Sequence, residues 1–112
     1  MKTALASLLL IALGTAATAD DDDGFVMGAG QWTCAKALEV EASGTDIENG
    51  LLVGWLLGYW SAATFAREEA FVATVKTHGG KAIYDTTMAQ CRDADPGVQL
   101  YLLTQAIIQN TK

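Results

Sequence analysis

A long uncharged stretch, from Gly50 to Ala66, carries the clearest pattern of apolar positions in the chain. Small residues recur there at every fourth position, which places them on one face of a helix with large apolar groups beside them. The small residues are Gly50, Gly54, Gly58, Ala62 and Ala66. Each glycine inside a helix costs roughly 0.8–1 kcal/mol relative to alanine, so Gly54 and Gly58 require close packing or a binding partner. We predict that this stretch is the central helix of a small bundle.

Capping residues mark helix boundaries on the N-terminal side of this stretch. Thr33 is a candidate N-cap for a first helix that ends at Gly44. The segment 45–48 has the pattern of a capping box, in which the threonine hydroxyl and the glutamate each bond to a backbone N–H of the helix start. The central helix is therefore expected to begin here and to end at about residues 67–70.

The second half of the chain predicts two more helices. Residues 69–76 fit either a helical continuation or an ordered loop, and the glycine pair after His78 predicts a break. A third helix is expected over residues 81–93, and a fourth is expected to start at Asp95-Pro96-Gly97 and to run to the C-terminus. The inward side of the third helix is expected to carry Ile83, Tyr84, Met88 and Cys91. The fold class predicted is all-α, a bundle of about four helices.

The first 19 residues have the pattern of a secretory signal peptide, with Lys2 at the start, an apolar run, and Ala17 and Ala19 before the expected cleavage site. An uncleaved anchor is the alternative, but the apolar run is shorter than the roughly 20 residues that span a bilayer. We therefore expect a periplasmic protein without a stable membrane anchor after cleavage. Residues 20–31, acidic and then glycine-rich, are expected to form a flexible arm, and residues 32–112 a single helical domain.

Cys34 and Cys91 are the only cysteines in the sequence. In the oxidising compartment that a signal peptide implies, they are expected to form a disulfide. Closing a loop of about 57 residues stabilises a fold by about 4 kcal/mol in the chain-entropy description. Two free thiols, or a bond between subunits, are the alternatives. A metal site is not expected from two distant cysteines and a single histidine.

The charge of the chain limits its partners. The sequence has 7 Lys+Arg and 13 Asp+Glu, and loss of Lys2 with the signal peptide leaves 6 against 13, or about −7. An acidic protein lacks the positive surface that nucleic acid requires, so we expect protein partners, among them a second copy of the chain. Below pH 3, protonation of the carboxylates would change the net charge to about +6 or +7, depending on His78.

Catalytic chemistry is not indicated by any motif. His78 lies beside two glycines and has no associated nucleophile, so an exposed loop histidine is expected. Neighbouring acidic residues such as Glu68 and Glu69 are typical of solvated helix faces or caps. The glycines of the central stretch follow no strand and precede no lysine, so they do not form a phosphate-binding loop. We expect a protein that is not an enzyme, with no catalytic, cofactor-binding or metal-binding residues.

Aromatic residues of the central stretch are the candidate partner-binding groups. Trp55 and Tyr59 share a helix face, and we expect them in the core, whereas Trp60 is turned about 100° from Tyr59 and fits either the core or an interface. Aromatic anchors and small residues are both features of protein interfaces. The candidate interface therefore comprises Gly54, Trp55, Gly58, Tyr59 and Trp60.

Three short motifs resemble those of HdeA/HdeB-like small periplasmic helical proteins. They are T-C-x-x-x-L (Thr33, Cys34, Leu38), G-W-x-x-G-Y-x-S/A (Gly54, Trp55, Gly58, Tyr59, Ser61), and a C-terminal pattern with Cys91, Pro96 and Leu100. The resemblance implies an acid-stress chaperone that works without ATP and binds unfolding proteins when protonation exposes apolar surface. The chain is also similar to Tai-type immunity proteins, which neutralise type VI secretion effectors, and that similarity implies a binding module for one secreted effector.

Overall fold

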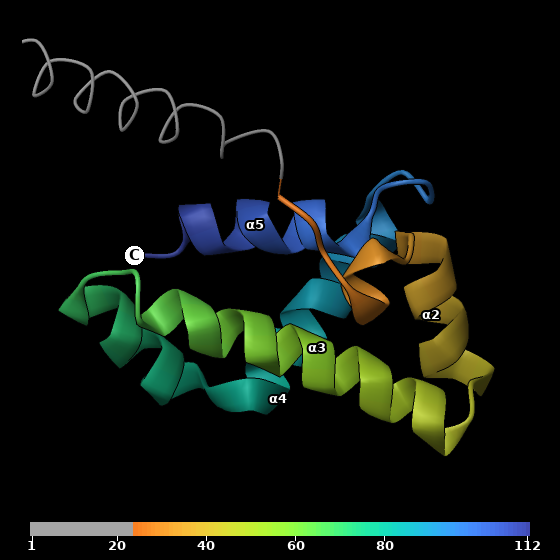
Figure 1. The fold of residues 1–112 in the computed structure, drawn as a ribbon, viewed down its shortest axis with the longest axis horizontal. Helices are drawn as coiled ribbons and strands as arrows, with labels where there is room; N and C mark the ends of the chain where they lie inside the picture. The colour runs from red at the N-terminus through yellow and green to blue at the C-terminus, as the bar shows by residue number, and fades with distance from the viewer. Residues whose placement is uncertain (1–23) are drawn as a thin grey trace, which may run out of the picture.

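The computed structural model describes residues 24–112, and the predicted signal peptide and the four aspartates after it lie outside the described residues. A single 3₁₀ turn and four α-helices make up the described chain (Figure 1). They are η1 (Gly28–Gln31), α2 (Cys34–Ser43), α3 (Asp46–Thr64), α4 (Glu69–Asp93) and α5 (Leu100–Asn110). The all-α fold class predicted from the sequence is confirmed.

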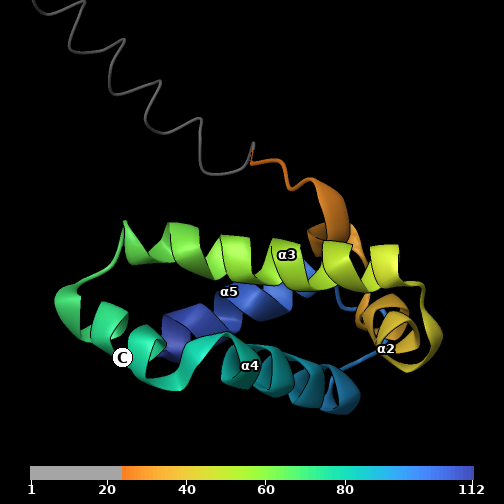
Figure 2. The ribbon, with the colours of Figure 1, turned by 90° about the horizontal axis from the view of Figure 1, so that it is seen from below.

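The long helices α3 and α4 lie on opposite sides of the molecule, and α2 closes one end (Figure 2). Helix α5 packs against both long helices, and α2 contacts both as well. The helices enclose two clusters of buried side chains, one at each end of α3. The cluster at the α2 end contains Cys34, Ala37, Val40, Leu52, Met88, Cys91 and Leu100. The cluster at the other end contains Leu56, Trp60, Phe71, Ile83 and Ile108.

The predicted caps of α2 and α3 are present. The hydroxyl oxygen of Thr33 accepts the backbone N–H of Lys36 at 3.1 Å. At the start of α3 the hydroxyl oxygen of Thr45 accepts the N–H of Glu48, and the Glu48 carboxylate accepts the N–H of Thr45, both at 3.1 Å. Each bond satisfies an N–H group that has no partner within its own helix, which explains why the chain turns sharply here.

Cys34 and Cys91 form the predicted disulfide, with their Cα atoms 5.1 Å apart. Both residues are buried, at 0% and 1% exposure, inside the cluster at the α2 end. The bond therefore connects the start of α2 to the last turns of α4, where core packing already brings the two helices together.

Helix α4 resolves the ambiguous segment and contains the predicted break. Residues 69–76 are helical, and Gly79 interrupts the helix with a φ of 77° and a ψ of 172°. A positive φ is unfavourable for residues with a Cβ atom, so the helix bends at a glycine. The second segment begins near the predicted position, and Ile83, Met88 and Cys91 are buried on its inner side.

Two predicted boundaries differ from the structure. Helix α3 ends at Thr64, a few residues short of the expected end, and a turn leads directly into α4. The last helix begins at Leu100 with Gln99 as N-cap, so the prediction of a start at Asp95-Pro96-Gly97 is wrong. The physical reason is a backbone pairing: the N–H groups of Cys34 and Ala35 donate to the carbonyl oxygens of Val98 and Pro96, at 2.7 and 3.1 Å. These N–H groups at the start of α2 lack helical partners, and the turn before α5 satisfies them.

The described part of the expected flexible arm, from Gly24 onward, also differs from the prediction. Phe25 and Met27 are exposed, but Gly28–Gln31 form the turn η1, in which Ala29 and Gly30 are buried. The turn contacts both α3 and α5. Packing against these helices orders a glycine-rich sequence that local propensity alone would leave without a fixed conformation.

Candidate functional site

Helix α3 presents an uncharged, exposed face on the side opposite the core. Successive residues turn by about 100° around a helix, so positions at intervals of three and four lie along this side. We call it the α3 outer face. It consists of Ile47, Gly50, Leu51, Gly54, Gly58, Ser61, Ala62 and the C-cap residue Phe65, all of which are exposed. Its large apolar side chains lie towards the two ends, with exposures of 76% for Ile47, 53% for Leu51 and 91% for Phe65.

The middle of the α3 outer face is a notch made by glycines. Apart from its chain neighbours and the backbone of its own helix, a Cβ atom built on Gly50, Gly54 or Gly58 would meet no described atom within 4 Å. No described segment therefore uses the absence of their side chains, although each glycine costs roughly 0.8–1 kcal/mol relative to alanine. The close packing that the sequence indicated at Gly54 and Gly58 is not made inside the described bundle, which leaves an outside partner as the candidate explanation.

The aromatic candidates of the sequence analysis do not share a surface with these glycines. Trp60 points into the core, is 5% exposed and stacks on Phe71, with ring centroids 5.8 Å apart. Trp55 and Tyr59 are half-buried along another side of α3, with ring centroids 5.0 Å apart. The five candidate residues are thus distributed around the helix. Only the two glycines belong to the α3 outer face, and its large apolar side chains, Ile47, Leu51 and Phe65, were not among the candidates.

Trp55 depends on a different glycine for its position. A Cβ atom on Gly30 would overlap the six-membered ring of Trp55 and lie 2.6 Å from Val26 Cγ1. Close approach of η1 to α3 therefore requires glycine at this position. The sequence carries no local signal for this contact, because the two residues are far apart in the chain and belong to different elements.

Charged groups at the N-terminal end of α3 form a network that depends on pH. The N–H of Thr45 and the Lys36 ammonium, whose Nζ is 3.1 Å from Glu48 Oε2, lower the pKa of the Glu48 carboxyl below its ordinary value of about 4.5. A carboxylate with a lowered pKa in the fold contributes stability above its unfolded value, and this contribution is lost as the pH falls through the folded value. Acid therefore weakens the junction of α2 and α3.

Replacing Glu48 with glutamine should reveal this contribution. We expect Glu48→Gln to lower the free energy of unfolding at pH 7, and this loss should diminish as the pH falls through the lowered pKa of Glu48, because the native carboxyl then becomes protonated as well. Urea denaturation at pH 7, 5, 4 and 3 measures the difference. Glu39→Gln is the matched control, because Glu39 is exposed on α2 and makes no ion pair within residues 24–112. An equal loss at all four pH values would contradict the assignment.

Arg67 holds the other end of α3 to the C-terminus. Its guanidinium donates to the carbonyl oxygens of Ile108 at 2.9 Å and Thr111 at 2.8 Å, and lies 4.2 Å from the ring centroid of Phe71. Ile108 lies in the last turn of α5 and Thr111 is its C-cap, so Arg67 bonds to carbonyl groups at the helix end, where the regular helical pairing stops. Arg67 also bonds Glu68 and thereby lowers the pKa of the Glu68 carboxyl.

A groove continues from the α3 outer face towards α5. It has a volume of about 460 Å³ and begins at Ala62, which is also part of the outer face. Alanine side chains and Ile108 contribute apolar lining, and Arg67 and two glutamines contribute polar groups. The lining residues are Tyr59, Ala62, Ala63, Ala66, Arg67, Gln105, Ile108 and Gln109. The groove extends the apolar surface that a partner could cover.

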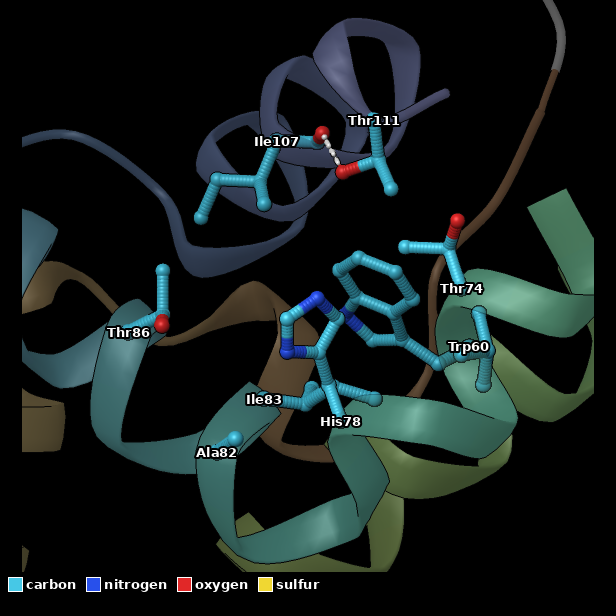
Figure 3. A pocket seen from close by; sticks show the side chains of 9 residues that line it. Trp60, Thr74, His78, Ala82, Ile83, Thr86, Ile107 and Thr111 are labelled. Atoms are coloured by element: carbon cyan, nitrogen blue, oxygen red, sulfur yellow. Dashed lines mark hydrogen bonds between the residues drawn. The ribbon is translucent and has the colours of Figure 1, made fainter.

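A second, smaller pocket lies on the inner side of α3, within the bend of α4 (Figure 3). Its volume is about 190 Å³, and Trp60 forms one wall. The indole Nε1 of Trp60 is buried and has no hydrogen-bond partner in the described chain. A buried donor without a partner costs about 1–3 kcal/mol, so this atom is one that a ligand could satisfy.

Neither a candidate metal-holding cluster nor a membrane-spanning helix occurs in the described residues. Residues 24–112 contain no group of three or more His, Cys, Asp or Glu side chains that could hold a metal ion. Over the same range, no helix has both the length and the apolar character needed to cross a bilayer. His78 is exposed, as expected, but it lies within α4 and not in a loop, so that part of the prediction is wrong. It lines the smaller pocket, and no serine or cysteine lines that pocket.

Comparison with known proteins identifies no relative of this chain. No family model, no curated protein and no solved structure matches this chain. The resemblance to HdeA/HdeB-like and Tai-type proteins therefore depends on the short motifs of the sequence.

Proposed function

We propose that this chain is a non-enzymatic, periplasmic protein-binding protein whose binding surface is the α3 outer face. The observation that carries the proposal is that α3, beyond its charged first turn, has no charged residue on any side, while only one side of it packs in the bundle. A helix that is apolar all round normally has partners on all sides. An uncharged apolar face with charged residues only at its ends is typical of a protein interaction site.

The shape of the face favours a partner helix. Gly54 and Gly58 allow a backbone to approach closely, as small residues do where helices cross. Ile47 and Phe65 are 18 positions apart, or about 27 Å along the helix axis, and provide apolar anchors at either end of the notch. A helix of a client, of an effector or of a second copy of the chain would fit this arrangement.

The finer proposal is an acid-stress chaperone of the HdeA/HdeB-like type. Acidification changes the net charge from about −7 to about +6 or +7, and it removes the bonds of Glu48 in the first turn of α3 and of Glu68 just before α4. If a second copy covers the outer face at neutral pH, charge repulsion would separate the two copies and release the face for unfolding clients. The disulfide limits how far the bundle opens.

An immunity-type binding module is the alternative, and the glycine notch favours it. A narrow notch between two apolar anchors suits one complementary helix better than many unrelated clients. On this alternative the chain binds a single secreted effector tightly at neutral pH.

Client protection and size measurements together distinguish these functions. If the protein is a chaperone, it should suppress aggregation of a model client at pH 2–3, and its own molecular size should decrease between pH 7 and pH 2 as two copies separate. The immunity module predicts one partner that co-purifies from a periplasmic extract at pH 7. If the protein in several-fold excess over the client does not suppress aggregation, the chaperone function is ruled out. If no partner co-purifies at pH 7, the immunity function is ruled out.

Alanine at both notch glycines should change stability and binding in opposite directions. We expect Gly54→Ala with Gly58→Ala to raise the free energy of unfolding by about 1.5–2 kcal/mol, because alanine is the better helix former and no described atom is near. The same pair should weaken partner binding, and leucine at both positions should weaken it by at least about tenfold. Denaturation and the aggregation assay measure the two effects. Leu102→Ser, at an exposed apolar position on α5, is the control that should leave binding unchanged.

A further inference from the structure

The pocket in the bend of α4 is built from three helices. Thr74, Val75 and His78 precede the bend at Gly79, and Ala82 and Ile83 follow it. Trp60 of α3 and Ile107 of α5 close the other sides (Figure 3). The bend, with its glycine in the left-handed region, separates the two segments of α4 and opens the space between them. The pocket is therefore a consequence of backbone geometry and is separate from the α3 outer face.

One polar atom at this pocket lacks a partner. Trp60 is 5% exposed, and its Nε1 makes no hydrogen bond with any described residue. In Figure 3 the nitrogen of the indole points to the side on which His78 lies. Indole nitrogen is a donor only, so it can be satisfied only by an acceptor atom.

The neighbouring hydroxyl groups do not supply that acceptor. Thr111 donates to the carbonyl oxygen of Ile107 at 2.8 Å, the bond drawn in Figure 3. Thr74 donates to the carbonyl oxygen of Lys112 at 2.6 Å and is also 3.0 Å from that of Ala70. These bonds hold both side chains in place, and neither their hydroxyl oxygens, nor that of Thr86, nor the His78 imidazole accepts the Trp60 N–H.

The other lining residues indicate the polarity, charge and size of a molecule that the pocket could bind. Val75, Ile83 and Ile107 are apolar, and no Asp, Glu, Lys or Arg lines the pocket. A site without a fixed charge favours a neutral molecule, since an ion would lose its hydration without compensation. A cavity of about 150 Å³ holds benzene, so a volume of about 190 Å³ suits a molecule of roughly nine non-hydrogen atoms.

We propose that this pocket binds a small neutral aromatic or aliphatic molecule with an apolar body and one hydrogen-bond acceptor, held by the Trp60 indole N–H. The acceptor oxygen meets Nε1 at the inner wall, and the apolar body packs against Val75, Ile83 and Ile107. His78 lies at the rim, where it borders the entering molecule.

Two probes of equal shape test the role of the acceptor. Acetophenone carries a carbonyl oxygen where α-methylstyrene carries a methylene group. Titration of the full secreted protein, followed by the indole N–H signals in ¹H–¹⁵N NMR spectra, separates Trp60 from the other two tryptophans. We expect acetophenone to move the Trp60 signal in a saturable manner and to bind about 3- to 10-fold more tightly than α-methylstyrene.

Two variants identify the groups involved. Trp60→Phe keeps a ring against Phe71 but removes the donor, so the two probes should bind it with equal affinity, measured on the methyl signals of Ile83 and Ile107. Ala82→Leu fills the pocket from a half-buried helical position and should weaken both probes at least tenfold. Thermal denaturation confirms that each variant is folded, and Ala82→Leu keeps the test decisive if Trp60→Phe unfolds.

Several results would contradict this assignment of the pocket. The proposal is overturned if acetophenone at 10 mM leaves the Trp60 signal unchanged, if both probes bind the native protein equally, or if Ala82→Leu binds as the native protein does. Movement of the Trp60 signal by a client polypeptide, with no response to either probe, would assign the pocket to a partner side chain and would also overturn it. The outer-face variants leave these results unchanged, so the two proposals fail independently.

Discussion

Replacing Phe71 with alanine is expected to lower the free energy of unfolding by about 3–5 kcal/mol. Phe71 is fully buried, stacks on Trp60 and lies beneath the Arg67 guanidinium. Removal of the ring leaves a cavity in the cluster at the Phe71 end of α3 and frees both neighbours from their positions. Urea denaturation followed by circular dichroism measures the loss.

Phe65→Ala is the matched control for this prediction. Phe65 is the same residue type only six positions earlier, but it is 91% exposed on the α3 outer face. Its removal should change the unfolding free energy by less than about 0.5 kcal/mol, as for other surface substitutions. The same variant should weaken partner binding if the outer face is the binding surface. A large loss of stability from Phe65→Ala, or a small one from Phe71→Ala, would contradict the arrangement of α3 and α4.

Removal of the disulfide should have an effect of similar size. For the double variant Cys34→Ala, Cys91→Ala we expect the unfolding free energy to fall by about 4 kcal/mol, because the bond closes a loop with a sequence separation of 57 residues. Both sulfurs are buried among apolar side chains, so the helical structure should persist at low temperature with a lower midpoint. Chemical denaturation of the oxidised protein and the double variant provides the comparison.

Reduction of the native protein is the control for the cysteine substitutions. Dithiothreitol should produce nearly the same loss as the double variant, since both open the same loop. A loss below about 1 kcal/mol in both cases would mean that the α2 cluster is stabilised by packing alone. A loss in the variant without one in the reduced protein would point to the alanine substitutions themselves.

The sequence was sufficient where local chemistry determines structure. Thr33 and Thr45 begin helices because their hydroxyl oxygens accept unpaired N–H groups, and this requirement can be recognised within four residues. Gly79 marks a bend for a similarly local reason. The disulfide followed from there being only two cysteines and a predicted oxidising compartment.

Features that depend on distant segments could not be predicted. Asp95-Pro96-Gly97 has the local pattern of a helix start, but the carbonyl oxygens of Pro96 and Val98 bond to the start of α2, and α5 begins later. The orientation of α3 was equally hidden, because the helix is apolar on both sides and its pattern does not distinguish the buried side from the exposed one. The sequence therefore suggested Trp55 and Tyr59 as core residues and left Trp60 open, whereas Trp60 is the most deeply buried of the three.

The position of the Cys34–Cys91 bond also determines how the protein responds to mechanical tension. A pulling force applied to the two ends of the described chain passes through the cross-link, because the sulfurs join residues on either side of α3 and most of α4. Only residues 24–33 and 92–112 can then be extended, and α5 and η1 would detach while the enclosed loop bears no load. Under traction, this protein would lose its outer elements while the helix bearing the α3 outer face remained within the unstretched loop.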